Sequence, residues 1–286
     1  MQIEIITIYV ICDDYLKAMD YQDDEQVGMT TAEVMTTALV AARFFKNCLE
    51  HARVFLKEEG YIPTMLGDSR LNRRLHGIAE QVWLALFHLL GDVHQQLNDS
   101  LDYIVDSLPI AICDNYRIPR GRLYRDHRPA FRGYIASKHR YFYGLRAHVL
   151  VTAGGQPVDL VLAPASVADL SAFKCLYLDL PDGATIYADK AYTDYGCEDV
   201  LNDDTAITLV ALRKRNAKRP MDGCVRYICH HVRKRIETSF SRIADFFAKR
   251  IYAITPRGIE LKAFLAVLAF SIDCLTPVEL LGSKSR

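Results

Sequence analysis

The sequence predicts an α/β protein in which a mixed sheet flanked by helices follows an all-helical N-terminal region. Residues 1–97 carry apolar residues at helical spacing, whereas strand-like runs that alternate with helical segments begin after a junction at 98–101. We therefore predict a helical domain over 1–99 and an α/β domain over 100–280.

Length and charge agree with this division. The chain has 286 residues, of which 50% are hydrophobic, so it is long enough for two domains with sizeable cores. Residues 1–100 carry 8 basic and 15 acidic residues, a net charge of −7, and residues 101–286 carry 27 and 20, a net charge of +7. An anionic partner such as nucleic acid is therefore expected on the second part.

The N-terminal region reads as a series of helices. They are expected over Ile3–Met19, Val34–Phe45, Cys48–Glu59 and from Ser69, as N-cap, through Leu90. Thr30 and Glu33 have the spacing of a capping box ahead of the second helix. Arg70, Arg73 and Arg74 cluster at the start of the last helix, which suits a helix-turn-helix-like module. The acidity of the region equally favours a helical bundle that supports the second domain or dimerises.

The apolar run Ile3–Cys12 is expected to be neither a signal peptide nor a membrane span. Glu4 interrupts it, no basic region precedes it, and two aspartates follow it. The eight cysteines lack paired spacing, which favours reduced thiols in a cytoplasmic protein.

One cluster of cysteine and histidine is a candidate zinc site. It contains Cys224, Cys229, His230 and His231. We do not predict zinc there, because this spacing lacks the usual C-x2-C pair and adjacent histidines rarely ligate one ion together.

The first strand of the α/β domain is expected over Tyr103–Cys113, and it contains Asp106. A carboxylate within an apolar run is costly unless it binds a cation, which makes Asp106 a candidate metal ligand. Asp114 is a rival, but it precedes what reads as a loop. Pro109 makes an unbroken central strand doubtful.

Residues 115–146 are strongly basic and aromatic. Nine basic residues stand against one acidic residue over these 32 positions, with seven tyrosine and phenylalanine residues between them. The basic residues are Arg117, Arg120, Arg122, Arg125, Arg128, Arg132, Lys138, Arg140 and Arg146. Cations for phosphates and rings for unstacked bases indicate a nucleic-acid groove, whereas the alternative is a solvated basic loop with hairpin aromatics buried in the core.

A β-hairpin and a helix are expected next. Gly144–Thr152 and Val158–Ala163 pair across a turn that contains two glycines. A helix should follow over Leu170–Leu178, with Asp169 as its cap.

The second candidate carboxylate is Asp189. It follows the buried strand Thr185–Ala188, which an Asp-Gly turn precedes, and the C-terminal end of such a strand is where ligand chemistry occurs in open sheets. Asp194 and Asp199 lie further from the strand end, in a helix expected from Asp194 onward. A strand over Ala206–Leu212 and a second basic run from Arg213 follow.

The third candidate carboxylate is Glu237. Apolar residues recur at helical spacing over Val232–Phe247, and Glu237 lies beside this buried stripe. Arg233 is four residues earlier and can pair with Glu237 on the same helix face, so a solvated ion pair is the alternative to catalysis. The closing run Ile259–Leu275 is expected to be a core helix.

Two strand carboxylates and one helix carboxylate supply the hard oxygen ligands that a two-metal phosphoryl-transfer site requires. The sequence therefore predicts that Asp106, Asp189 and Glu237 bind two Mg²⁺ or Mn²⁺ ions.

At this point the chain resembles the DDE-type transposases of bacterial insertion sequences over roughly residues 100–275. Five motifs in order carry the resemblance: D-S at Asp106, Y-F-Y-G-L-R-A-H-V before the second strand, A-P-A-S-V-A-D before a helix, A-D-K-A-Y at Asp189 and R-K-R-I-E-T-S-F at Glu237. The resemblance implies an RNase H-like catalytic domain.

The chain departs from the pattern that many relatives carry on the last helix, which is Tyr, Arg, Glu and Lys at fixed spacing. Arg233 and Glu237 match, but His230 stands in the Tyr position and Ala244 in the Lys position. A contact of that Lys with a terminal phosphate or a flipped base is unsupported here unless Arg242 or Lys249 replaces it.

The resemblance implies a DNA transposase that cleaves the ends of an insertion sequence and transfers the strand into target DNA. Its partner would be double-stranded DNA, bound by a homodimer in the bacterial nucleoid, without a membrane. Expected phosphate contacts are Arg120, Arg122, Arg125, Arg128, Lys138, Arg140, Lys190, Arg213, Lys214 and Arg215. Arg233 is expected to orient Glu237 or a phosphate. An RNase H-like nuclease without strand transfer and a non-catalytic DNA-binding descendant remain alternatives.

Overall fold

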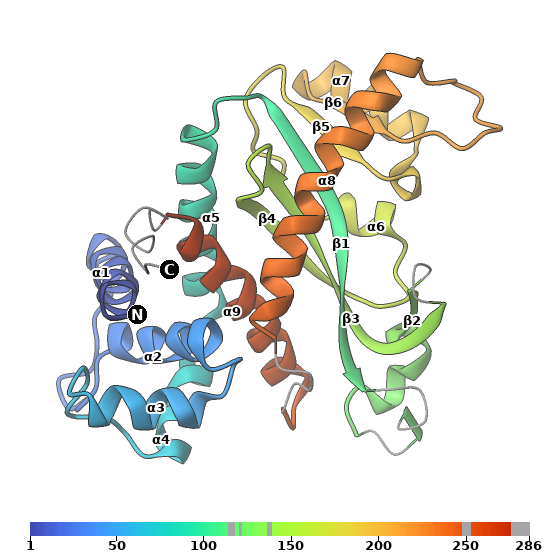
Figure 1. Ribbon diagram of the computed structural model, residues 1–286. Helices are drawn as coiled ribbons and strands as arrows, with labels where there is room; N and C mark the ends of the chain where they lie inside the picture. The colour runs from blue at the N-terminus through green and yellow to red at the C-terminus, as the bar shows by residue number, and fades with distance from the viewer. Residues whose placement is uncertain (114–117, 120–121, 136–138, 248–252, 276–286) are drawn as a thin grey trace, which may run out of the picture. The chain divides into compact units, whose positions relative to one another are not determined.

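The computed structural model describes residues 1–113, 118–119, 122–135, 139–247 and 253–275 (Figure 1). Some residues named above lie outside these ranges: Asp114, Arg117, Arg120, Lys138 and Lys249. The chain divides into two compact units. One comprises Met1–Leu89, Ile243–Ile251 and Arg257–Arg286, and the other comprises Leu90–Arg242 and Tyr252–Pro256.

The N-terminal region is all helical, as predicted. Its helices are α1 (Gln2–Ala18), α2 (Thr31–Phe44), α3 (Leu49–Glu58), α4 (Asp68–Gly77) and α5 (Glu80–Gln96). The capping box ahead of α2 is confirmed. The Glu33 amide donates to the Thr30 hydroxyl at 3.2 Å, and the Thr30 amide donates to the Glu33 carboxylate at 2.7 Å.

The prediction of one helix from Ser69 through Leu90 is wrong. The chain forms α4, which has Gly67 rather than Ser69 as its N-cap, and then α5 as a separate helix. Gly77 is a poor helix former, and Ile78 leaves the helix with an extended backbone at φ −64° and ψ 127°. The Ile78 side chain is buried by this break.

The core helix predicted over Ile259–Leu275 is present as α9 (Pro256–Leu275), and most of it belongs to the first compact unit. Arg43 on α2 ties it to the N-terminal helices, since its guanidinium lies 2.6 Å from Asp273 on α9 and 3.3 Å from Glu4 on α1.

No helix in the described ranges is both long enough and apolar enough to cross a membrane.

The second unit contains a six-stranded mixed sheet. Its strands are β1 (Asp102–Cys113), β2 (Arg132–Ile135), β3 (Arg140–Thr152), β4 (Pro157–Pro164), β5 (Thr185–Ala188) and β6 (Thr208–Ala211). The order is β2-β3-β1-β5-β6, and β4 also pairs with β3. The pairs among β1 to β4 are antiparallel, whereas β1, β5 and β6 run parallel. This arrangement confirms the predicted RNase H-like mixed sheet.

The doubt that Pro109 cast on an unbroken first strand was misplaced. β1 pairs with β5 only over Asp102–Ile104, and at Pro109 its ladder partner is Arg146 of β3. Among the described residues, β3 is the one neighbour of β1 at Pro109, so the side of Pro109 that faces away from β3 has no ladder hydrogen bond to lose.

The hairpin of β3 and β4 is confirmed. Gly155 occupies its turn at φ +89°, a left-handed conformation that favours glycine. A Cβ at Gly155 would also overlap the Ser239 hydroxyl of α8 (Gly223–Asp245). This close approach anchors α8 to the hairpin.

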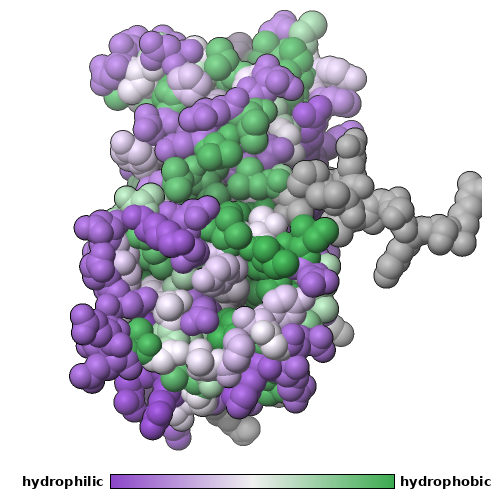
Figure 2. Space-filling model, turned by 90° about the vertical axis from the view of Figure 1, so that its left-hand side faces the viewer, coloured by the Kyte–Doolittle hydropathy of each residue, from purple (hydrophilic) through white to green (hydrophobic). Residues whose placement is uncertain are grey.

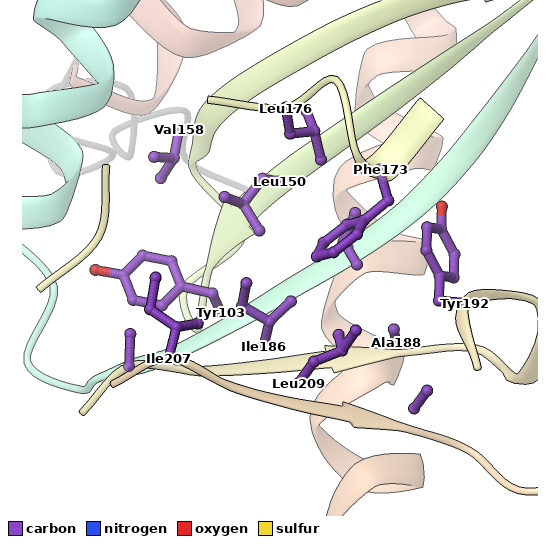
Figure 3. Packing of buried hydrophobic residues seen from close by; sticks show 13 residues of the cluster. Tyr103, Leu150, Val158, Phe173, Leu176, Ile186, Ala188, Tyr192, Ile207 and Leu209 are labelled. Atoms are coloured by element: carbon purple, nitrogen blue, oxygen red, sulfur yellow. The ribbon is translucent and has the colours of Figure 1, made fainter. Parts of the chain in front are cut away.

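Helices cover both faces of the sheet (Figure 1). On one face, α6 (Asp169–Phe173) and α7 (Tyr195–Thr205) pack against a cluster of buried apolar residues that Figure 3 shows from close by. Val105 belongs to this cluster, so the next residue of β1, Asp106, points to the opposite face, where α8 lies.

Two predictions about the segment after β4 are wrong. The expected helix over Leu170–Leu178 is the shorter α6, and Asp169 does not cap it. Ala168 is the N-cap position, and the Asp169 side chain forms an ion pair with Arg146 at 3.1 Å instead. The half-buried guanidinium of Arg146 outcompetes the helix amides for this carboxylate.

Candidate active site

The strand register places Asp106 and Asp189 side by side. Ile104 of β1 pairs with Tyr187 of β5, and continuing this parallel register by two residues sets Asp106 opposite Asp189. Because side chains alternate along a strand, both carboxylates face α8. Asp189 directly follows β5, as predicted from the sequence, whereas Asp106 lies within β1.

Asp106 is partly buried and lies beside the cation Arg233. Its side chain is 24% exposed, and it accepts hydrogen bonds from the Ser107 amide at 2.8 Å and from Arg233 at 2.7 Å. Burial raises the pKa of Asp106, while the Arg233 charge and the Ser107 amide oppose this rise. In this partly buried position, the ionised form of Asp106 therefore depends on a nearby positive charge.

Arg233 contacts both aspartates. Its Nη2 lies 2.7 Å from Asp106 Oδ2, and its Nη1 lies 3.7 Å from Asp189 Oδ1. Asp189 also accepts a hydrogen bond from the Lys190 amide at 2.7 Å. The two strand carboxylates therefore share one cation. The expected ion pair of Arg233 with Glu237 is not formed. The Arg233 guanidinium contacts Asp106 and Asp189 on the sheet instead.

Glu237 lies one helical turn beyond Arg233 on α8, and its side chain is exposed. No group of three or more His, Cys, Asp or Glu side chains close enough to hold a metal ion occurs among the described residues. The structure thus brings Asp106 and Asp189 together around Arg233, with Glu237 on the neighbouring turn of the same helix.

Three contacts hold α8 in place over this pair. Arg235 donates to the Ala153 carbonyl at 2.9 Å, and the Ser239 hydroxyl donates to the Gly155 carbonyl at 2.9 Å, both in the β3–β4 turn. Ile236 is fully buried between them. This anchoring fixes the position of Arg233 and of Glu237 along the sheet.

The residues weighed as a zinc site point in different directions. Cys229 is buried, with its sulfur 3.9 Å from the Ala188 carbonyl oxygen, whereas Cys224, His230 and His231 are exposed. All eight cysteines are free thiols.

Most described candidates for phosphate contact are exposed. These are Arg122, Arg125, Arg140, Lys190, Lys214 and Arg215. Arg128 donates to the Pro119 carbonyl at 3.2 Å. Arg213 is engaged by both carboxylate oxygens of Glu198, at 2.6 and 2.5 Å, so its charge is already neutralised.

The interleaved aromatic residues divide between core and surface. Phe131, Phe142 and Tyr143 are buried, as the alternative interpretation expected. Tyr134 and Tyr141 are 40% and 48% exposed on the β2–β3 hairpin, with ring centroids 4.9 Å apart. Tyr134 and Tyr141 are therefore the aromatic residues that, within the described part of this segment, are exposed enough to stack on bases.

The arginine cluster of α4 is also divided. Arg70 and Arg73 are exposed, but Arg74 is half-buried and lies 3.1 Å from Asp23. At least one of the three therefore serves the structure of the first unit.

The sequence interpretation missed a polar cluster of buried and half-buried residues on the other face of the sheet. His148 is fully buried, with Nδ1 3.8 Å from Asp169 and 3.4 Å from the Tyr192 hydroxyl. Arg146 pairs with the same Asp169 carboxylate. The available signal was the pair of polar residues two positions apart in an otherwise apolar strand, which marks one face of that strand.

Burial lowers the pKa of His148 to about 4, although the Asp169 charge acts in the opposite direction. Between about pH 6.5 and pH 4 the unfolded chain binds a proton at this residue that the folded chain does not. The free energy of unfolding should therefore decrease as the pH falls through this range, by up to roughly 3 kcal/mol. Chemical denaturation from pH 7.5 to pH 4 should show a shallower decrease in His148→Gln, and equal decreases in both proteins would contradict this prediction.

The second unit has the RNase H-like mixed sheet flanked by helices, on which Asp106, within β1, lies beside Asp189, directly after β5. Residues 98–272, more than half of the chain, match the family described as the transposase DDE domain. The chain belongs to this family of transposases. No curated protein and no solved structure matches it.

Proposed function

We propose that the protein is a DNA transposase that cleaves phosphodiesters at the ends of an insertion sequence and joins the freed ends to target DNA. The observation that carries this proposal is the convergence of Asp106 and Asp189 on one cation, Arg233, within a chain of the DDE family. Cleavage and joining are both in-line displacements at phosphorus, so one site serves both steps.

The donor set fits divalent metal ions. The carboxylates of Asp106 and Asp189, which are hard oxygen ligands, already share the Arg233 cation. Glu237 supplies a third carboxylate one helical turn beyond Arg233. We assign Asp106, Asp189 and Glu237 as the ligands. When bound, two Mg²⁺ or Mn²⁺ ions would supply charge neutralisation and Lewis acidity at the reacting phosphate.

Arg233 neutralises the aspartates in the free protein. A guanidinium presents two parallel donors that match a phosphate as well as a carboxylate. We propose that Arg233 passes to a DNA phosphate during the reaction and orients it, while Ser107 keeps its amide bond to Asp106.

The exposed cations would hold the duplex. We propose Arg122, Arg125, Arg140, Lys190 and Lys214, with Arg215, as phosphate contacts, because phosphates dominate the affinity of such interfaces. Arg120 and Lys138 remain candidates from the sequence alone. Arg128 and Arg213 are secondary, since both are only partly exposed.

The helical region, 1–99, is proposed to support DNA binding or to dimerise, with the catalytic part over 100–280. Apolar side chains on α1 are exposed, among them Ile3 (57%), Ile6 (49%) and Val10 (46%). Figure 2 shows hydrophobic residues at the molecular surface among hydrophilic ones. Exposed apolar stripes of this kind mark interaction surfaces, which supports a homodimer.

The test is product analysis with a labelled duplex that contains the ends of the DNA element encoding the chain, plus a plasmid as target. We expect Mg²⁺ or Mn²⁺ to support cleavage and covalent joining of the label to the plasmid, and Ca²⁺ to support neither. Cleavage without joining would identify a nuclease, and binding without cleavage would identify a non-catalytic descendant. Full turnover in chelator would exclude the metal-dependent mechanism.

A further inference from the structure

We propose that a polar network on the face of the sheet opposite α8, with the half-buried Asp169 as its hub, positions the two strand carboxylates for metal binding. The network comprises Ser107, Arg146, His148, Asp169 and Tyr192. The inference rests on the proposed function, because it assumes that Asp106 and Asp189 are ligands. It adds residues whose part in that function is to position the ligands rather than to contact metal or DNA.

The network is continuous across β1, β3, α6 and the turn Lys190–Tyr192 after β5. Asp169, at the start of α6, lies 3.1 Å from Arg146 and 3.8 Å from His148, which are neighbours on one face of β3. His148 in turn lies 3.4 Å from the hydroxyl of Tyr192. Arg146 reaches back to the Ser107 hydroxyl at 3.5 Å.

Each end of the network adjoins a candidate ligand. Ser107 follows Asp106 in β1, points to the opposite face, and donates its amide hydrogen to the Asp106 carboxylate at 2.8 Å. Tyr192 closes the turn after Asp189, since its amide donates to the Asp189 carbonyl at 3.0 Å. Asp106 is therefore linked through the backbone to Ser107, and Asp189 to Tyr192. Asp169 connects to these two residues on the far face through Arg146 and His148.

Packing leaves these groups little freedom. His148 and Tyr192 are fully buried, and the Tyr192 ring meets Phe173 of α6 edge-on at 6.0 Å (Figure 3). Arg146 also donates to the Tyr134 carbonyl at 2.9 Å. Side chains locked in this way transmit a fixed position to the backbone that carries them.

A role in positioning makes a different prediction from a role in folding alone. If Asp169 only stabilises the sheet, its loss lowers stability and leaves metal affinity unchanged. If it sets the spacing of Asp106 and Asp189, its loss weakens metal binding, as removing outer-shell partners typically does by about 10- to 100-fold.

The matched control is Glu198, which forms a similarly buried ion pair with Arg213 in the same unit. Glu198→Gln removes one charge from a buried pair, as Asp169→Asn does, but Arg213 contacts neither candidate ligand in the described residues. Circular dichroism melting of both variants reports their loss of stability.

The test measures Mn²⁺ binding to the full chain by calorimetry without DNA, and the Mg²⁺ concentration that gives half-maximal cleavage. We expect Asp169→Asn to weaken Mn²⁺ binding and to raise the half-maximal Mg²⁺ concentration at least about tenfold, with a smaller change in the rate at saturating metal. Glu198→Gln should leave both values within about twofold of wild type. Tyr192→Phe, which loses only the hydroxyl, should shift them in the same direction as Asp169→Asn but less.

Unchanged Mn²⁺ affinity in a folded Asp169→Asn protein, with affinity lost in Asp189→Asn, would overturn the positioning role and leave the proposed function intact. If Asp169→Asn does not fold, unchanged affinity in Tyr192→Phe overturns it equally. If Asp106→Asn and Asp189→Asn both still bind Mn²⁺ with wild-type affinity, the ligand assignment is refuted, and with it both proposals.

Discussion

Neutralising any of the three carboxylates should abolish DNA cleavage. We expect Asp106→Asn, Asp189→Asn and Glu237→Gln each to lower the cleavage rate at least about a thousandfold, because a bound metal supplies several kcal/mol of transition-state stabilisation. DNA binding should stay intact or tighten, since each change removes a negative charge that repels phosphate. Gel-based cleavage with the labelled duplex and a parallel binding titration measure the two effects.

The control for this experiment is Asp199→Asn, which removes an exposed carboxylate paired with Arg219 in the same unit. Its rate should remain close to that of the wild type, because surface pairs contribute little. Full cleavage by any one of the three variants would remove that residue from the proposed site. For Glu237 this outcome would mean that the exposed side chain is only a solvated helix residue.

The second large effect concerns DNA affinity. Replacing Arg120, Arg122 and Arg125 together with alanine should flatten the dependence of log affinity on log salt by about two to three units, since each phosphate contact contributes roughly 0.9. At about 0.1 M salt this corresponds to a loss of roughly several hundredfold in affinity. Filter-binding or anisotropy titrations of duplex DNA over a range of salt concentrations measure the slope.

Arg70, Arg73 and Arg74 provide the comparison, as a triplet of equal charge in an acidic part of the chain. Arg74 is already paired with Asp23, so fewer of these charges are free for phosphate. Replacing them should change discrimination between end sequences if α4 reads bases, or change nothing if the region is a bundle. Equal losses of slope from both triplets would contradict the proposed division between the two parts of the chain.

The sequence was sufficient to predict the fold class and the strand positions of two carboxylates. A buried strand that ends in an aspartate is a local pattern, and so is the Thr30 and Glu33 capping box that the structure confirms. The role of Asp106, Asp189 and Glu237 stays a prediction, although the register of β1 and β5 brings the two aspartates together as that role requires.

Other features depend on contacts that the local sequence does not encode. Arg233 has a plausible partner four residues away in Glu237, yet it binds Asp106, which is 127 residues distant. Asp169 has the position of a helix cap, but Arg146 on a neighbouring strand takes its carboxylate. Pro109 is tolerated because β5 ends its pairing with β1 before that residue, which is a property of the sheet and not of the strand.

The most direct test of the metal assignment is a crystal structure of the protein bound to a DNA end and Mn²⁺, with manganese located by its anomalous scattering. The assignment predicts anomalous peaks about 2.1 Å from carboxylate oxygens of Asp106 and Asp189, with Glu237 as a third ligand and Arg233 moved from the aspartates to a phosphate. Peaks at other residues, or Arg233 still paired with both aspartates while DNA and Mn²⁺ are bound elsewhere, would contradict it.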